Sequence, residues 1–270
     1  MKALGHYLER LMQRFGRRII QTIIELGHIS IFAGKFFYWA VRPPFRWKLL
    51  FEQLYFIGNQ SIFIIAVASV FTGMVFAYEV YFGFQIISVD SLVGPCVAFA
   101  LAKELAPALS GIIVAGRAGA AMAAQIGTMK VTEQVDALEV MGIDSIQYLA
   151  VPRIIASALA LPLLSALFLL IGNLGAWWVS TRTLMIDESL YFSKLSEIVF
   201  VSNIFEGLIK AMVFGFVLAV IGTYFGFQTT KGAEGVGKAT NLSVVWGMIL
   251  VLILDYFLTS FLTAILSIGG

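Results

Sequence analysis

Long hydrophobic runs, interrupted only by isolated charged residues, fill most of the chain. Uncharged stretches lie between Glu52 and Glu79, between Arg153 and Arg182 and between Lys210 and Lys231, and another runs from about Leu242 to Leu266 around Asp255. Each is long enough to cross a bilayer, for which a helix needs about 20 residues. The pattern therefore predicts four membrane-spanning helices at these places.

A further apolar region, Ser91 to Met129, is too long for one straight span. Lys103, Glu104 and Arg117 interrupt it, and prolines stand at positions 95 and 107. A helix of this length would reach about 58 Å at about 1.5 Å per residue, which is well beyond the hydrocarbon core. We expect a second crossing here that is kinked, broken or projects from the membrane, which brings the crossings to five.

The first 50 residues show a different pattern. Apolar residues at spacings of four, three and four (Leu4, Leu8, Leu11, Phe15) alternate with basic ones at other positions of the helical wheel (Arg10, Arg14, Arg17). This is typical of an amphipathic helix that lies in the membrane interface. A second segment, Leu26 to Val41, is apolar but too short to span and contains Lys35, so we expect it to lie in one leaflet.

Basic residues indicate the orientation. Nine of the 18 Lys and Arg residues fall in the first 50 positions, and Lys130, Arg153 and Lys238 lie on the same side of the five predicted crossings. The opposite side has Arg182 and Lys194, together with several acidic residues. The positive-inside rule therefore favours a cytoplasmic N-terminus and an external C-terminus.

Composition agrees with an all-α integral membrane protein. The chain has 270 residues, of which 60% are hydrophobic and only 13% charged, and its mean hydropathy is +0.92. No stretch is left for a soluble catalytic domain, and nucleic acid is a poor partner for so apolar a chain. The single cysteine, Cys96, excludes a disulfide within the chain, and the two distant histidines argue against a metal site.

Charged residues inside apolar regions usually face a cavity or pair with one another, because each is costly at membrane depth. Lys103, Glu104 and Asp255 are candidates for a polar site in a transport path, although Lys103 and Asp255 could equally form a structural ion pair. Glu206 and Lys210 are four residues apart, so we interpret them as a helix-surface pair near the outer interface.

Small residues recur every four positions at Gly111, Ala115, Gly119 and Ala123. This spacing allows close helix packing in lipid, either within one subunit or across a dimer. The segment Gly232–Thr240 fits G-x-x-x-x-G-K, but Ala239 stands where Ser or Thr would hold magnesium and no strand precedes it. We interpret it as a flexible cytoplasmic turn and not as a nucleotide site.

Between the second and third crossings, Thr128 to Asp144 predicts a short amphipathic helix that ends at Gly142. Val131, Val135 and Leu138 share one face, and Glu133, Asp136 and Glu139 share another. An acidic face suits anionic lipid poorly, so we expect a protein partner there.

Together these features resemble the MlaE family of ABC-transporter permeases, which serve outer-membrane lipid asymmetry. The matching motifs are Gly73-Met-Val, Lys103-Glu-Leu-Ala-Pro107, Ala115-Gly-Arg-Ala-Gly-Ala120, Ile126-Gly-Thr-Met-Lys-Val-Thr-Glu-Gln134, Ala137-Leu-Glu-Val-Met-Gly142, Val151-Pro-Arg153, Gly235-Val-Gly-Lys-Ala-Thr240 and Leu254-Asp255. They run in order from about residue 50 to the C-terminus. Lys103 departs from the family's usual arginine, whose bidentate fork an ammonium group cannot reproduce.

The resemblance implies a non-enzymatic subunit of the bacterial inner membrane that works as a homodimer. It implies separate cytoplasmic ATPases of the MlaF type that bind ATP and Mg, no cofactor in this chain, a STAS-domain MlaB-like subunit and a periplasmic hexamer of MlaD-like MCE-domain proteins. Phospholipid would move between the membrane and these carriers. Residues 1–50 would be membrane-elbow helices, residues 51–270 the permease domain, and about 130–142 the coupling helix, with Glu133, Asp136, Glu139 and Met141 at the ATPase.

In this family the lipid cavity lies between two permease copies near the outer leaflet. By that resemblance we expect a lining of Phe76, Glu79, Tyr81, Phe84, Ile87, Lys103 and Glu104, with Asp255 close by. The alternative is an ion-coupled secondary transporter of an amphipathic substrate, since such carriers also have broken helices and buried charges. A membrane-embedded enzyme has little support, because the chain has no HExxH or G-x-S-x-G motif.

Overall fold

The computed structural model describes residues 2–86, 89–230 and 232–268. The α-helices in this part of the chain are α1 (Lys2–Ala40), α2 (Trp47–Gln85), α3 (Val93–Ala100), α4 (Ala106–Val114), α5 (Ala120–Val131), α6 (Gln134–Val140), α7 (Val151–Arg182), α8 (Glu188–Ile198), α9 (Val201–Phe227) and α10 (Gly232–Ile268). Shorter segments of other helical types are η1 (Asp90–Leu92), η2 (Leu101–Leu105), η3 (Ala115–Gly119) and η4 (Ile146–Ala150).

Five stretches are long and apolar enough to cross a membrane. They are Trp47–Gln85, Asp90–Val131, Ile146–Arg182, Val201–Phe227 and Gly232–Ala264. Helices satisfy their backbone polar groups internally, which spanning segments in lipid must do. The predicted all-α membrane fold with five spans is confirmed.

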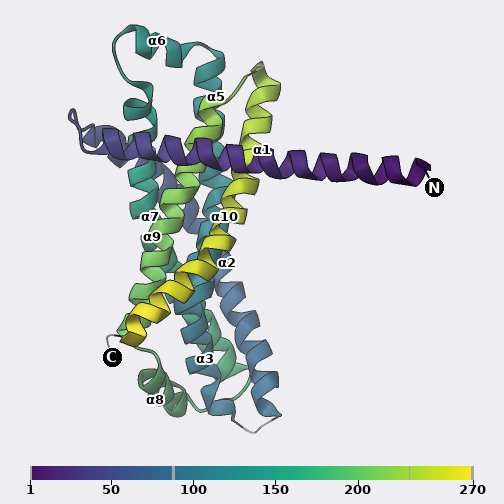
Figure 1. The fold of residues 1–270 in the computed structure, drawn as a ribbon. Coiled ribbons are helices and arrows are strands. Elements are labelled where there is room, and N and C mark those ends of the chain that lie inside the picture. Colours follow the sequence, from purple (N-terminus) through teal and green to yellow (C-terminus); the bar gives the residue numbers. More distant parts are fainter. Residues whose placement is uncertain (1, 87–88, 231, 269–270) are drawn as a thin grey trace.

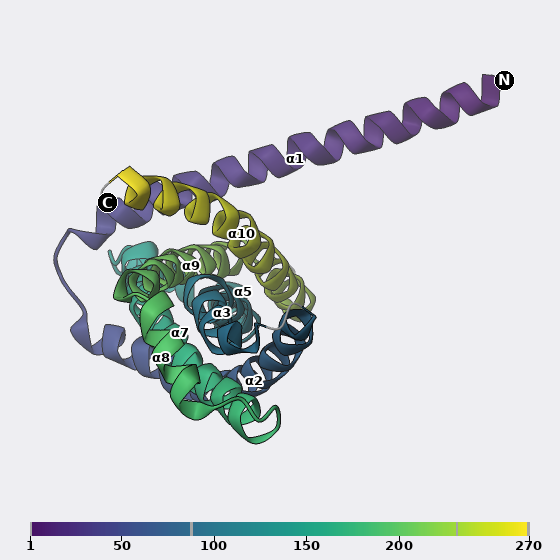
Figure 2. The same cartoon turned by 90° about the horizontal axis from the view of Figure 1, so that it is seen from below.

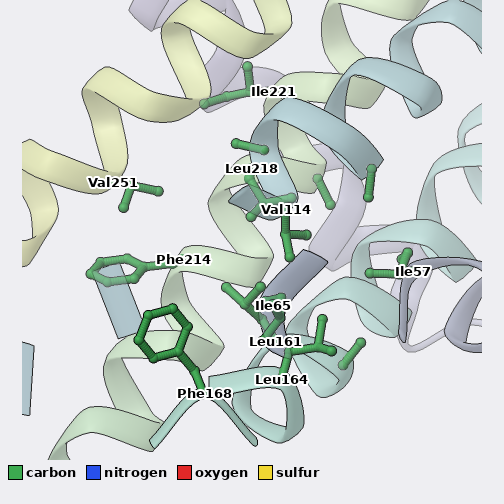
Figure 3. Close-up of a cluster of buried hydrophobic side chains, with 14 of the residues drawn as sticks. Ile57, Ile65, Val114, Leu161, Leu164, Phe168, Phe214, Leu218, Ile221 and Val251 are labelled. Carbon is green, nitrogen blue, oxygen red and sulfur yellow. The ribbon is translucent and has the colours of Figure 1, made fainter. Parts of the chain in front are cut away.

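The second span forms the centre of the bundle. Seen along the bundle axis, α3 and α5 stand in the middle, and α2, α7, α9 and α10 surround them (Figure 2). Buried side chains of these helices meet in one hydrophobic core, which includes Ile65, Leu161, Phe168, Phe214 and Leu218 (Figure 3). At one end of the bundle α6 projects beyond the other helices, and α8 lies across the opposite end (Figure 1).

Two π-helical segments interrupt the second span, and each contains charged residues. Segment η2 carries Lys103 and Glu104, and η3 carries Arg117. Pro107 explains the first: it has no N–H for the carbonyl of Lys103 four residues earlier, and its ring would clash with that carbonyl in a regular helix. The wider turn of a π segment relieves this clash. The predicted interruption at these charges is therefore a change of helical winding within a continuous stretch.

Glycines allow the closest helix contacts. A Cβ atom on Gly73 of α2 would lie 1.9 Å from the carbonyl oxygen of Gly172 on α7, and one on Gly207 of α9 would lie 2.0 Å from that of Ala102 on η2. Neither position has room for a side chain. The second contact brings α9 against the charged turn of the second span.

The N-terminal region is one continuous helix where the sequence predicted two segments. Helix α1 crosses the other helices in the view of Figure 1, whereas Figure 2 shows that it lies along one side of the bundle and projects beyond it; its buried residues Ile29, Phe32 and Phe36 pack on the core. The hydroxyl of Tyr224 on α9 donates to Glu25 over 3.2 Å. The side chains of Leu4, Leu8, Leu11 and Phe15 lie outside the part that the structure describes.

Two sequence interpretations require correction. The Gly232–Thr240 segment is the beginning of α10 and not a flexible turn, and a Cβ atom on its Gly235 would lie 1.5 Å from the carbonyl oxygen of Thr230. The fourth span begins at Val201, well before Lys210. Glu206 and Lys210 therefore lie inside the bundle and are not a surface pair.

Candidate functional site

Five charged side chains from three helical elements meet inside the bundle. Segment η2 supplies Lys103 and Glu104, α9 supplies Glu206 and Lys210, and α10 supplies Asp255. We call these five residues the charged network. Lys103, Glu104 and Asp255 were predicted from the sequence as a polar site, and the structure brings these three together with the two residues of α9.

Lys210 is the central cation. Its side chain is fully buried, and its Nζ lies 2.7 Å from Glu104 and 3.3 Å from Asp255. The same ammonium group donates to the hydroxyl of Thr259 over 2.6 Å and to the backbone carbonyl of Lys103 over 2.9 Å. That carbonyl is the one that Pro107 leaves without a helical donor, so Lys210 satisfies a backbone acceptor as well as two carboxylates.

Lys103 pairs with Glu206 and not with Asp255. The distance between Lys103 Nζ and the Glu206 carboxylate is 3.1 Å, and the ammonium lies 5.3 Å from the ring centre of Phe99. The side chain of Glu206 is 1% exposed, and its Oε1 atom is buried without a hydrogen-bond partner. The structural Lys103–Asp255 pair considered from the sequence is not formed, although both residues belong to one network.

The charged network is open on one side. The side chain of Glu104 is 37% exposed, whereas that of Lys210 is completely buried. Two ammonium groups stand against three carboxylates, so the network has an excess of acceptors when all five groups are ionised. A ligand that approaches from the Glu104 side would meet Lys103, Glu104 and Asp255 before Lys210.

A large apolar cavity lies on the same segment of the second span. It has a volume of about 610 Å³, and its lining includes Ala98, Ala102, Leu174, Trp177 and Leu195 from the second span, α7 and α8. Ala102 precedes Lys103 in the chain, so the cavity and the charged network share the η2 segment. This cavity was not predicted from the sequence, because little in the sequence of α8 beyond the N-cap residue Asp187 indicates a helix there.

The remaining predicted lining residues lie on α2 or outside the described chain. Phe76, Tyr81 and Phe84 are partly buried and pack against the hydrophobic core. Glu79 is exposed and takes no part in the charged network. Ile87 lies outside the residues that the structure describes.

Arg117 has a separate environment. Its guanidinium group donates to the hydroxyl of Ser61 over 3.0 Å, to the side-chain oxygen of Gln60 over 2.9 Å and to the carbonyl of Phe56. It therefore connects η3 to α2 through neutral acceptors. These partners could not be inferred from the sequence, because a Ser or Gln residue in a span does not by itself indicate an interaction with an arginine.

The predicted small-residue face packs against α9 and α10 of the same chain. A Cβ atom on Gly111 would lie 3.2 Å from Val251, and one on Gly119 would lie 3.7 Å from the hydroxyl oxygen of Ser243. Ala115 and Ala123 are fully or almost fully buried. Of the two packing alternatives, the structure has these residues in contacts within the subunit.

Helix α6 presents an apolar tip at the far end of the bundle. Val140 is 89% exposed and Met141 is 65% exposed, whereas Val135 is buried against Ile126 and Leu149. Two of the acidic residues, Asp136 and Glu139, have interaction partners within the chain. Lys130 pairs with Asp136 at 2.6 Å, and the Ser145 hydroxyl donates to Glu139 over 2.9 Å.

Glu133 begins this helix in a left-handed conformation, with φ of +60°, and is exposed. The sequence predicted the helix and its acidic residues. It did not predict that the apolar pair Val140 and Met141 would be highly exposed at the tip, because Val140 lies beside the acidic residues on the helical wheel.

Glu206, Lys210 and Thr259 were missed as site residues, although their positions in the sequence carry a usable signal. Two opposite charges inside an apolar helix need partners of opposite charge in lipid, and the adjacent pair Lys103-Glu104 offers both. Thr259 stands one helical turn after Asp255 and donates to the Glu104 carboxylate over 3.2 Å.

Known proteins resemble this chain over most of its length. The family model described as "Permease MlaE" matches residues 50–261. A "Probable ABC transporter permease protein" of Rickettsia bellii is 39% identical over 252 residues, which is 93% of this chain and 97% of the relative. The "Intermembrane phospholipid transport system permease protein MlaE" of Haemophilus influenzae is 34% identical over 250 residues, 91% of this chain and 94% of that protein.

A plant protein is also similar. "Protein TRIGALACTOSYLDIACYLGLYCEROL 1, chloroplastic" of Arabidopsis thaliana is 34% identical over 233 residues, which cover 86% of this chain and 67% of the plant protein. The chain is thus a non-catalytic, multi-pass membrane subunit, and ATP hydrolysis is the work of a separate protein. By family match and by similarity along its length, it belongs to the MlaE family of ABC-transporter permeases.

Proposed function

We propose that this chain is the membrane subunit of an ATP-driven phospholipid transporter. It works as a homodimer in the bacterial inner membrane, with its N-terminus in the cytoplasm and its C-terminus outside. MlaF-type ATPases bind ATP and Mg, the chain itself carries no cofactor, and a STAS-domain MlaB-like protein and a hexamer of MlaD-like MCE-domain proteins complete the complex. Lipid passes between the membrane and these periplasmic carriers.

The charged network beside a large apolar cavity is the observation that carries the proposal. A phospholipid needs a cation or hydrogen-bond donor for its phosphate and an apolar space for its acyl chains. Lys103 offers a partly exposed ammonium group, and the cavity of about 610 Å³ lies at the same η2 segment. The names of the relatives from Haemophilus and Arabidopsis refer to phospholipid transport and to a glycerolipid, which supports a lipid as substrate.

Helix α6 is the coupling element in this proposal. It follows α5, the last part of the central span, and precedes η4 and α7, so a push on its tip acts on two spans. The π segments η3 and η2 interrupt the central span between α6 and its far end, and such interruptions are places where a helix bends. Closure of the ATPases would then move the η2 turn and change the shape of the lipid site.

The composition of the complex is tested first by purification in nanodiscs from the native membrane, with mass spectrometry of all that accompanies the tagged chain. We expect a stoichiometric ATPase, an MCE-domain protein and bound phospholipid. Recovery of this chain alone, under conditions that preserve other membrane complexes, would contradict the proposal and favour the ion-coupled carrier.

The site is tested by transfer of a fluorescent phospholipid from vesicles that contain the complex. Glu104→Gln removes a partly exposed charge from the network, and we expect a several-fold slower transfer. Glu52→Gln is the matched control, since Glu52 is exposed on α2 and belongs neither to the network nor to the expected cavity lining. Equal rates for both variants and the original protein would remove Glu104 from the transport path.

A further inference from the structure

The connection between α1 and α2 encloses a second pocket, which the proposed transport path does not use. The pocket has a volume of about 190 Å³ and lies where the connection folds against the beginning of α7. Its wall is mainly apolar and includes Trp39, Phe45, Trp47, Leu50, Val151 and Ile155. Such a wall suits a hydrocarbon chain better than water or a free ion.

Two arginines, Arg42 and Arg46, line the same pocket. The guanidinium group of Arg46 lies 4.6 Å from the ring centre of Tyr148, and its Nη1 atom is buried without a hydrogen-bond partner. Arg42 stacks on the ring of Tyr38 at 3.8 Å and donates to its hydroxyl. Neither guanidinium forms an ion pair with an acidic side chain in the described residues, so both keep donors for an anion.

The position of the pocket matches the edge of a lipid leaflet. The connection runs along the outside of the bundle (Figure 2), at the level where α1 crosses it and the first span begins (Figure 1). Tryptophans at such a boundary prefer the headgroup level. In the orientation proposed above, this is the cytoplasmic leaflet, and anionic lipid headgroups there attract basic side chains.

We propose that this pocket binds one anionic glycerophospholipid of the cytoplasmic leaflet. Arg42 and Arg46 hold its phosphate, and one acyl chain lies along the apolar wall between the connection and α7. A free phosphate would satisfy the arginines but leave this wall uncovered. The bound lipid therefore fastens the end of α1 to α2 and α7, at a place separate from the charged network.

The test uses tryptophan fluorescence, because two of the five tryptophans line the pocket. Trp177→Phe, Trp178→Phe and Trp246→Phe leave Trp39 and Trp47 as reporters in the full chain. In phosphatidylcholine vesicles, a low fraction of phosphatidylglycerol with brominated acyl chains should quench them several-fold more than brominated phosphatidylcholine does. Equal quenching by both lipids would overturn the proposal.

Variants separate a built site from general surface charge. Arg42→Gln with Arg46→Gln should reduce the quenching to the phosphatidylcholine level, whereas Lys48→Gln should not, because Lys48 is a neighbouring exposed cation outside the lining. An equal loss with Lys48→Gln would indicate a diffuse charge effect and contradict the site.

A third variant keeps the result decisive if the double arginine variant does not fold. Ile155→Phe retains both charges but fills part of the pocket, so it should also reduce quenching; unchanged quenching would place the lipid elsewhere and overturn the proposal. The inference uses the proposed orientation but not lipid transfer. Loss of transfer in Glu104→Gln with quenching intact would therefore bear on transport alone.

Discussion

Lys210 shows how a single buried cation can organise three spans. Its ammonium group meets the Glu104 and Asp255 carboxylates, the Thr259 hydroxyl and a backbone carbonyl, and its side chain has no exposed surface. Removing one partner of such a group leaves the others unpaired in a medium that solvates them poorly. The residue is therefore important for stability whether or not it contacts a substrate.

Replacing Lys210 by methionine should destabilise the protein strongly. Breaking a buried ion pair by removing one partner costs about 3–5 kcal/mol in soluble proteins. We expect the midpoint of thermal unfolding in detergent to fall clearly. Size-exclusion chromatography with fluorescence detection measures this midpoint. Lys194→Met, which removes the exposed Lys194–Glu197 pair, is the control and should change stability by about 0.5 kcal/mol or less. Similar midpoints for the two variants would contradict the central role of Lys210.

Asp187 is a residue whose contribution should depend on pH. The hydroxyl of Ser189 and the backbone N–H of Leu190 donate to its carboxylate, which holds the pKa of Asp187 below its usual value. A carboxyl group with a lowered pKa in the folded state stabilises at neutral pH, and this contribution is lost as the pH falls through that pKa, below about 4. Asp187 is the N-cap of α8, so the loss should appear at that helix.

Hydrogen exchange measured by mass spectrometry checks this effect. The first turn of α8 should exchange faster at about pH 3 than at neutral pH, after correction for intrinsic rates. Asp187→Asn keeps an acceptor at the N-cap but does not titrate, so its exchange should not show this change. The same pH dependence in both proteins would assign the effect to another group.

At the scale of elements, the close contact of α2 and α7 depends on positions that cannot carry a side chain. The sequence predicts both spans from their length and hydrophobicity, but it does not say which glycine lies in a contact. Gly73 and Gly83 both stand in α2, and only the first meets another backbone. Space for a Cβ atom therefore distinguishes two residues that look equivalent in the sequence.

This difference gives a matched pair of substitutions. Gly73→Ala should lower the free energy of unfolding by about 1–3 kcal/mol or more. Its Cβ atom would lie 1.9 Å from the Gly172 oxygen, so the two helices would have to separate. Gly83→Ala meets nothing within 4 Å and should be neutral or slightly stabilising, since alanine favours helices over glycine. Thermal unfolding of both variants in one detergent is the measurement. A stable Gly73→Ala variant would show that α2 and α7 are not packed as described.

Helix α6 offers a prediction about the partner ATPase. Val140→Asp places a charge on the most exposed apolar position of the tip and should lower co-purification of the ATPase and lipid-stimulated ATP hydrolysis several-fold. Met185→Asp is the control, because Met185 is 81% exposed and adjoins α8 at the other end of the bundle, and Asp tolerates its positive φ. Equal effects of both variants would mean that α6 does not seat the ATPase.

At the scale of the whole molecule, hydrophobic length and isolated charges were sufficient to predict five spans and three of the five network residues. These signals are strong in a membrane protein, because a span needs a minimum length and because a charge inside a span is costly unless it is paired or faces a cavity. The pairing of the charges was not predictable, since Lys103 could meet either Asp255 or Glu206 until the positions of α9 and α10 were known. The cavity beside α8 depends on tertiary packing in the same way.

The orientation of the molecule in the membrane decides which leaflet each site faces. It can be measured by labelling single cysteines at the two ends of the bundle. In a Cys96→Ala background, Val140→Cys and Met185→Cys place single thiols at highly exposed positions toward the two ends of the bundle (Figure 1). With the N-terminus inside, a membrane-impermeant maleimide should label Met185→Cys in intact spheroplasts and Val140→Cys only after lysis. The opposite pattern would mean that α6 lies outside, away from any cytoplasmic ATPase, and that the Arg42–Arg46 pocket faces the outer leaflet. Both proposals therefore depend on this result.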